Sequence, residues 1–155
     1  LVYNFTTINV EAQLAHSGSM LHWVRQVLGV RREHEVFGTG SYRNVDASSA
    51  AVLAFLRERP ARADDEDDEG ESILCVFNLS QHPVSTELDL AGFEGRGLRD
   101  IFGGTVFGSV RDDGTTTVTL GSQGFYWLRL RSVRSDTHSP ATRSLPLVAA
   151  PAPGA

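Results

Sequence analysis

Carboxylates are the first residues in this chain that could do chemistry, because pairs of them can cleave or transfer a glycosidic bond. A retaining mechanism needs two carboxyl groups about 5–5.5 Å apart, one as nucleophile and one as acid–base. Six acidic residues form one continuous run at 64–69. Glu11 alone has a motif-like setting, in the segment Ile8–Gln13. We expect Glu11 to contact the helix that follows it, with a substrate contact as the alternative, so the sequence offers no catalytic residue.

Residues that bind metals or phosphate are present without the spacing that such sites need. A calcium loop requires alternating ligands and a glycine turn, so we interpret the run at 64–69 as a long, solvated hairpin loop, with a cation site or a partner-binding patch as alternatives. Gly103 and Gly104 lack the lysine and helix of a phosphate loop and predict a tight turn between strands. The five histidines have no metal-ligand spacing, and we expect ordinary surface or helix-end residues. They are His16, His22, His34, His82 and His138.

Three consecutive aromatic residues, Phe125, Tyr126 and Trp127, could stack on a sugar ring. Neighbouring residues of a strand point to opposite faces, so these three cannot form one platform. We therefore predict that they pack in the core and between domains, and sugar stacking is the alternative.

Composition limits the classes of partner. The formal net charge is −5, and the fourteen basic residues are all Arg and are scattered along the chain, so nucleic acid is not expected as a partner. No apolar stretch approaches the roughly 20 residues that cross a bilayer, and the start lacks a signal-peptide pattern. The single Cys75 excludes an intramolecular disulfide and suits a reducing, cytoplasmic location. Since residue 1 is not Met, we expect it to be an internal position of a longer protein or the start of a truncated one.

One helix is predicted at 20–35, because its apolar residues recur at spacings of three and four. Ser17 or Ser19 supplies the N-cap, and the glycines at 38 and 40 end the helix. The residues before it, 1–13, predict a loop. The apolar positions are Leu21, Val24, Val27 and Leu28.

After Gly40 the apolar period changes from 3.6 to 2, which is typical of strands. The segment at 73–79 is apolar on both faces and predicts a central strand, whereas 84–90 alternates with polar residues and predicts one wet face. Short strands separated by turn residues indicate an antiparallel β-sandwich. The predicted strands are Tyr42–Val45, Ala51–Arg57, Ile73–Leu79, Val84–Leu90, Leu98–Phe102, Thr116–Leu120 and Gly124–Leu130.

Several segments occur in the order and spacing of a known family. They are Ile8–Gln13, Glu87–Leu90, Phe93–Arg96, Ile101–Gly104 and Gly121–Trp127. Together they resemble the C-terminal region of the trehalose synthases, members of the α-amylase family (glycoside hydrolase family 13). Two features depart from the pattern: His16-Ser17-Gly18 replaces an expected Asp-Pro segment, and the acidic loop is longer.

The resemblance implies a mostly β fragment with three parts. Residues 1–38 would be the end of a (β/α)8 barrel with its last helix, 39–131 a C-terminal antiparallel β-sandwich domain like that of maltogenic amylases, and 132–155 a disordered tail rich in Pro, Ala and Ser. The apolar side of the helix would then face barrel strands that the chain does not contain. We therefore expect an exposed hydrophobic patch in the isolated chain.

The resemblance also implies the chemistry of the parent enzyme, which isomerises maltose to trehalose by intramolecular glucosyl transfer. No residue of this chain matches the family's nucleophilic Asp, acid–base Glu or stabilising Asp, so the fragment alone is expected to be inactive and structural. It needs no cofactor, although the parent barrel of such enzymes could hold calcium. Expected partners of the parent are maltose and trehalose, a second copy in a homo-oligomer, and a maltokinase.

Two alternatives stay open at this stage. The β-sandwich could be an interaction module that docks a maltokinase or a second subunit. The chain could also be the C-terminal part of another α-amylase-family glucosidase, acting on isomaltose-type substrates or sucrose, because the specificity loops would lie upstream.

Overall fold

The computed structural model describes residues 9–66 and 68–132. The tail predicted at 132–155 therefore lies outside the described residues, except for Ser132, as does the start of the segment Ile8–Gln13. Within the described residues, the chain has three helices followed by eight strands.

The helical region differs from the prediction in two places. The loop expected up to residue 13 instead contains a short helix, α1 (Val10–Ala15), because the side chain of Asn9 accepts a hydrogen bond from the backbone N–H of Ala12 at 2.8 Å and caps it. The long helix α2 (Met20–Glu33) begins after Ser19, as predicted. It ends earlier, because His34 is extended and a separate turn, α3 (Val36–Thr39), follows.

The strands form two antiparallel sheets, and every strand that the alternation predicted is present. The larger sheet has six strands in the order β1-β2-β3-β8-β5-β6, which places β3 centrally as its apolar faces predicted. The smaller sheet pairs β4 with β7. The strands are β1 (Ser41–Asn44), β2 (Val52–Arg59), β3 (Glu71–Asn78), β4 (Val84–Asp89), β5 (Gly97–Asp100), β6 (Val106–Ser109), β7 (Thr115–Leu120) and β8 (Phe125–Arg131).

Strand β6 was not predicted. It pairs with β5 through an irregular register, and its third residue, Gly108, has a φ of 86°. An edge strand of four residues with a left-handed glycine shows no run of alternating residues, so periodicity could not identify it. The turn predicted at Gly103-Gly104 does connect β5 to β6. There the carboxylate of Asp100 accepts the N–H of Gly103 at 2.6 Å, and Gly104 adopts a φ of 69°.

The main core lies between the two sheets. One face of the large sheet, called the inner face below, meets the apolar side of β4 and β7, whose other side is exposed as predicted for β4. Asn78 is buried in this core, and its side-chain amide has hydrogen-bond partners. Its amide N–H groups donate to the carbonyls of His82 and Gly121, both at 2.7 Å, and so tie two loops to the end of β3. The fully buried side chains include Leu56, Leu74, Val76, Leu88, Leu90, Leu98, Leu120 and Leu128.

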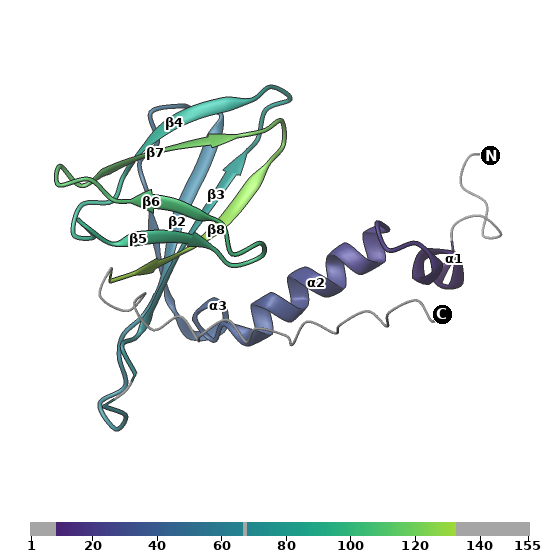
Figure 1. Ribbon diagram of the computed structural model, residues 1–155, viewed down its shortest axis with the longest axis horizontal. Helices are drawn as coiled ribbons and strands as arrows, with labels where there is room; N and C mark the ends of the chain where they lie inside the picture. Colours follow the sequence, from purple (N-terminus) through teal and green to yellow (C-terminus); the bar gives the residue numbers. More distant parts are fainter. Residues whose placement is uncertain (1–8, 67, 133–155) are drawn as a thin grey trace, which may run out of the picture.

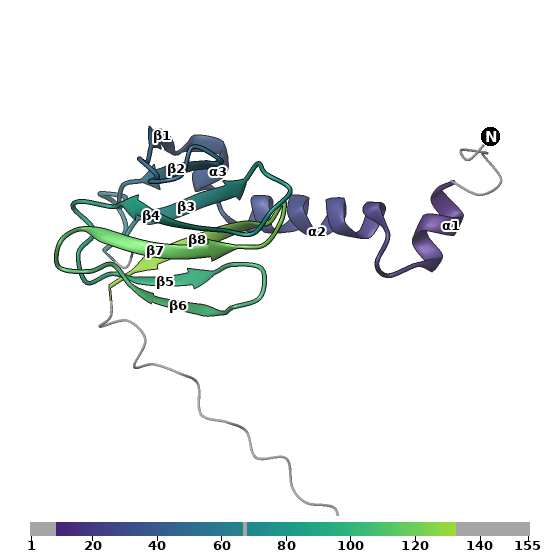
Figure 2. The same ribbon diagram turned by 90° about the horizontal axis from the view of Figure 1, so that it is seen from above.

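The opposite, outer face of the large sheet carries a second, smaller core. Val36 of α3 packs there against Ile73 and Cys75 of β3, and all three side chains are buried. Figures 1 and 2 show α2 extending from α3 away from the sandwich, with α1 at its far end. The sandwich is thus a closed unit, whereas α2 is attached to it mainly at one end.

Candidate interaction surface

Helix α2 has an apolar side that the rest of the described chain leaves open. Met20, Val24 and Leu28 follow one another at four-residue intervals, so they form one stripe. Their exposed fractions are 67%, 38% and 47%, and α2 has no buried residue. This confirms the expectation of an exposed hydrophobic patch at Val24 and Leu28, whereas Leu21 and Val27 of the predicted stripe are only partly exposed. A helix with such a stripe normally buries its apolar side against other secondary-structure elements.

The outer face of the large sheet adds a row of aromatic rings that crosses four adjacent strands. Tyr42 of β1 lies 5.0 Å from Phe55 of β2, Phe55 lies 6.0 Å from Phe77 of β3, and Phe77 lies 5.9 Å from Phe125 of β8, all between ring centroids. Trp23 of α2 meets the end of this row, with its ring 6.2 Å from that of Phe125 in an edge-on arrangement. The row is therefore connected to α2 through Trp23.

The three consecutive aromatic residues of β8 are divided between the faces, as strand geometry predicted. Phe125 and Trp127 lie on the outer face, where Trp127 packs 4.5 Å from Phe37 of α3. Tyr126 points the other way and contacts Phe107 at 4.6 Å. The three rings therefore form no single platform for a sugar.

A network of polar groups fixes the joint between α2 and the sandwich. Arg57 of β2 donates from Nη2 to the carbonyls of Val36, Phe37 and Gly40 at 3.2, 3.2 and 2.8 Å, which satisfies the carbonyl end of α3. His34, at the end of α2, contacts Oε1 of Glu71 through Nδ1 at 2.7 Å.

Glu71 is central to this network. Its side chain is only 8% exposed, and its carboxylate contacts one residue of the α2 end and one of β8. The same Oε1 that meets His34 also accepts Nε–H of Arg129 in β8 at 3.2 Å. His34 is thus at a helix end, as predicted, but it is not an ordinary surface residue. Arg57 and Arg59 lie on the outer face of β2, as does Phe55. An arginine at a strand position where the pattern is otherwise apolar indicates that a polar partner contacts its side chain, and this signal in the sequence could have pointed to the network.

The acidic loop between β2 and β3 is more ordered than the sequence suggested. Asp68 accepts two hydrogen bonds from Arg59, at 2.6 and 2.8 Å, and two more from the backbone N–H groups of Arg62 and Gly70. These donors hold the pKa of the Asp68 carboxyl well below its usual range, the pair with Arg59 contributing most. Arg62 in turn pairs with Glu35 at the α2–α3 joint. The hairpin loop predicted at 64–69 does join β2 to β3 and is exposed at Asp64, Asp65, Glu66 and Glu69, but Asp68 is partly buried and anchors the loop beside the joint.

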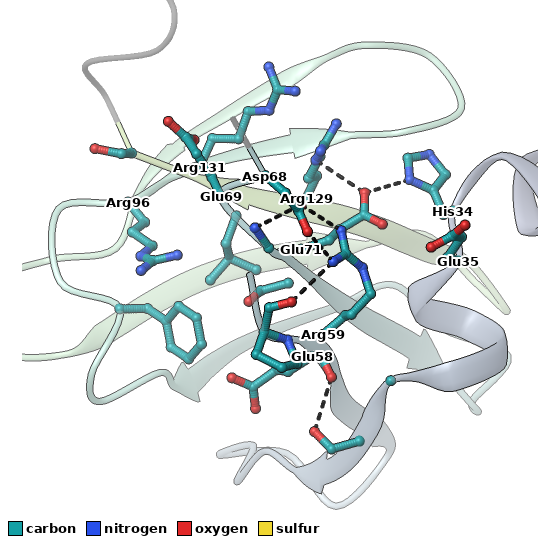
Figure 3. Close-up of a pocket in the computed structure, with 18 of the residues that line it drawn as sticks. His34, Glu35, Glu58, Arg59, Asp68, Glu69, Glu71, Arg96, Arg129 and Arg131 are labelled. Atoms are coloured by element: carbon teal, nitrogen blue, oxygen red, sulfur yellow. Dashed lines mark hydrogen bonds and ion pairs between the residues drawn. The ribbon is translucent and has the colours of Figure 1, made fainter. Parts of the chain in front are cut away.

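An open groove of about 1490 Å³ surrounds this joint (Figure 3). Six arginines and six carboxylates line it, and four of each are engaged in ion pairs with one another. The lining arginines and carboxylates are equal in number, so the groove presents no surplus of positive charge for an anion. The pairs are Arg43–Glu58, Arg59–Asp68, Arg62–Glu35 and Arg129–Glu71.

Other candidate groups in the described residues show no catalytic arrangement. Across 9–66 and 68–132, no three His, Cys, Asp or Glu side chains gather as metal ligands. Cys75 is 1% exposed, and burial raises the pKa of its thiol to about 12, so it is not a nucleophile. Glu11 is exposed in the first turn of α1, and His138 lies outside the described part of the chain. No helix among the described residues is long and apolar enough to span a bilayer.

Comparison with known proteins identifies relatives over most of the chain. The sequence is 41% identical over 129 residues to "Trehalose synthase" of Pimelobacter sp. (strain R48), which is 83% of this chain and 22% of that protein. It is 38% identical over 130 residues to "Trehalose synthase/amylase TreS" of Mycolicibacterium smegmatis, covering 84% of this chain and 22% of the relative. This chain thus spans about a fifth of the length of these relatives.

Solved structures show the same fold at lower identity. The trehalulose synthase MutB from Pseudomonas mesoacidophila MX-45 has a TM-score of 0.57 and 22% identity, over 83% of this chain and 21% of that one. A maltogenic α-amylase AmyB from Thermotoga neapolitana has a TM-score of 0.56 and 18% identity, over 74% of this chain and 26% of that one. The profile of the family described as Maltogenic Amylase, C-terminal domain, matches residues 42–127, which contain all eight strands but the first residue of β1 and the last four of β8. This chain therefore belongs to the family of maltogenic amylase C-terminal domains.

Proposed function

We propose that this chain is the C-terminal, non-catalytic part of a trehalose synthase, which isomerises maltose to trehalose by intramolecular glucosyl transfer. The observation that carries the proposal is the identity of 33–41% to trehalose synthases over 83–90% of the chain. The likeness to solved amylases and trehalulose synthases is 16–23% and supports the fold alone.

In such an enzyme the chemistry would take place outside this domain. A carboxylate attacks the anomeric carbon of maltose while an acid protonates the leaving oxygen. The released glucose turns in a closed pocket and attacks the glucosyl–enzyme through its own anomeric hydroxyl. This step competes with hydrolysis, so it depends on excluding water and on the high effective concentration of the trapped glucose.

The contribution of this chain would be structural. The apolar stripe of α2 faces away from the rest of the described chain, as expected of a helix on the outside of a barrel. The polar network around Glu71 fixes the sandwich to the end of that helix. A rigid attachment of this kind would hold the last barrel helix in place and so help to keep the pocket closed.

An exchange of domains tests the proposal. The 129 aligned residues of the Pimelobacter enzyme are replaced with those of this chain, and trehalose formed from maltose is measured. We expect the chimera to form trehalose, the same enzyme without this region to lose stability and activity, and the 155-residue chain alone to be inactive. A chimera that folds but yields only glucose, or a chain that converts maltose alone, would contradict the proposal.

Two further properties of the parent enzyme follow as proposals. We propose a cytoplasmic enzyme, which the single buried Cys75 supports because nothing in the chain depends on oxidation. We also propose that it is a homo-oligomer that can dock a maltokinase, supported by the exposed apolar side chains. Sedimentation of the full-length enzyme, with and without an added maltokinase, tests both associations.

A further inference from the structure

Strand β7 has a free edge that differs from the other edges of the two sheets. Among the described residues, β7 pairs only with β4. The far edge of β4 is bonded to residues 46–48, and the edge strand β6 has an irregular register and a left-handed glycine, which hinder pairing with another strand. The remaining edge strand, β1, has four residues and carries Arg43, whereas the six residues of β7 include no charge, Pro or Gly. The edge of β7 is therefore the one best suited to accept a further strand.

The hydrogen bonds of β4 show which main-chain groups of β7 point to this edge. The main chains of Glu87 and Asp89 bond to residues 46–48, away from β7. Along an antiparallel pair, residues alternate between facing the partner strand and facing away from it. The partners of Glu87 and Asp89 in β7 are Thr117 and Thr115. The N–H and C=O groups of residues 115, 117 and 119 therefore point away from β4.

Thr117 and Thr119 form the unused part of this edge. Thr115 is already engaged, because its carbonyl accepts the N–H of Arg111 at 2.9 Å and its own N–H donates to Asp113 at 2.9 Å; both bonds agree with the direction deduced from β4. No described residue bonds to the N–H or C=O groups of Thr117 and Thr119, and both residues are exposed. Two donors and two acceptors in alternation are what an added antiparallel strand would satisfy.

The inner face of the large sheet continues beyond the free edge of β7. Figures 1 and 2 both place β7 between β4 and the strands β5 and β6. On that side Phe107 of β6 and Tyr126 of β8 pack 4.6 Å apart between ring centroids, and both are only half-buried. A strand added to β7 would turn the side chains opposite Val118 and Leu120 inward, as these two are. Such a strand would satisfy the main chain of β7 and cover these rings together.

The same arrangement indicates what kind of molecule can bind. Because β5 and β6 extend past β7, two copies of this chain approaching through their β7 edges would bring their β6 strands into collision before the β7 strands could pair. A single extended segment has no second sheet and avoids this collision. A carbohydrate lacks a row of alternating N–H and C=O groups, whereas an extended peptide supplies one.

We propose that the free edge of β7 is a strand-addition site, which binds one extended, uncharged segment of a partner protein through the main chain of Thr117 and Thr119. Bound antiparallel, the segment would place apolar residues opposite Val118 and Leu120 and polar residues opposite the two threonines. This inference does not depend on the proposed function, because it concerns the small sheet alone.

A synthetic peptide with the sequence of residues 111–121 provides a probe. Paired antiparallel with its Thr119 opposite Thr117, it exchanges four main-chain hydrogen bonds with β7 and turns its Val118 inward. Amide hydrogen exchange of the 155-residue chain is measured by NMR with and without this peptide. We expect exchange at Thr117 and Thr119 to slow several-fold at saturation, while the amide of Tyr42 on the edge strand β1 stays unchanged.

N-methylated peptides supply matched controls that leave the chain itself unaltered. Methyl groups on the main-chain nitrogens of the peptide's Thr117 and Thr119, which face β7, should abolish the protection. Methyl groups on its Thr116 and Val118, which face away, should not. In the chain, Thr119→Pro removes an outward donor but no bond to β4, so it should weaken peptide binding about ten-fold. Thr119→Val keeps the N–H and should bind as the parent does.

Several outcomes would overturn the proposal. They include no protection by the unmodified peptide and equal protection by both methylated peptides. Protection of Thr117 and Thr119 that appears without peptide as the chain concentration rises would also count against it, because a second copy would then be the occupant. Protection in the chain alone that is lost when residues 133–155 are removed would do so too, since the occupant would then be a segment of this chain.

Discussion

At the scale of single residues, Asp68 shows how a charge in an apparently solvated run becomes structural. Its four hydrogen bonds lower the pKa of the carboxyl in the folded state. A depressed folded pKa stabilises the fold at every pH above the unfolded value of about 4. This stabilisation is lost as the pH falls from there towards the folded pKa.

We therefore expect Asp68→Asn to lower the melting temperature at pH 7 and to reduce the loss of stability on acidification below about pH 4. The exposed neighbour Asp64 supplies a matched control, since Asp64→Asn removes the same charge from the same loop. Thermal unfolding between pH 2.5 and 7 measures both effects. Identical pH profiles for the two variants would show that the loop is held by charge in general and not by the bonds of Asp68.

Arg57 is a second residue whose role is fixed by its contacts. Its three bonds to carbonyls of the α3 region include one of 2.8 Å to Gly40. Hydrogen bonds to a charged donor contribute about 1.5–3 kcal/mol each at most. We expect Arg57→Met to lower the free energy of unfolding by roughly 1–3 kcal/mol, because the carbonyls at the end of α3 lose their donor. Urea unfolding measures this. Arg43→Met, at an exposed arginine with one ion pair, should change it by less than about 1 kcal/mol.

At the scale of elements, the direction of α2 depends on Glu71, which joins α2 to β3 and β8. The extended residue His34 breaks the helix and would otherwise act as a free joint. We expect Glu71→Gln to weaken the contacts to both His34 and Arg129 and to broaden the range of directions that α2 adopts. The measurement is the distance between spin labels on Gln26 and Ser85. Glu58→Gln, at a carboxylate with a single, more exposed pair, should leave the distribution narrow; equal broadening would contradict the assignment.

The elements themselves were largely predictable, because they follow from local periodicity. The alternation in 73–79 and 84–90 identified a central strand and a half-exposed one, and the turn at Gly103-Gly104 followed from its residues alone. The prediction failed where a distant partner decides the outcome. Glu71 and Arg57 acquire their roles only when β2, β3 and α3 come together. The break between α2 and α3 has no Pro or Gly at its position, so the sequence around His34 gave no local signal for it.

At the scale of the whole molecule, the candidate site is an apolar interaction surface, and the described residues form no arrangement of catalytic groups. The exposed side chains of Val24 and Leu28 were predicted from helical spacing, whereas that of Met20 was not. The row of aromatic rings on the outer face could not be predicted, because its residues come from four strands and no single strand's sequence reveals how these strands pair. Both regions point to a molecule whose inner core is complete and whose outer side is not.

This asymmetry predicts how the 155-residue chain behaves alone. The sandwich should unfold cooperatively, because its core between the sheets is closed, while the stripe of α2 should bind a hydrophobic dye and promote self-association at high concentration. Val24→Gln with Leu28→Gln removes most of the stripe at positions that make no buried contact. We expect this variant to bind less dye and to sediment as a monomer, with a melting temperature within a few degrees of the parent. If the double variant instead unfolds the sandwich, α2 contributes to the core of the chain itself, and the open side of the molecule is smaller than its surface suggests.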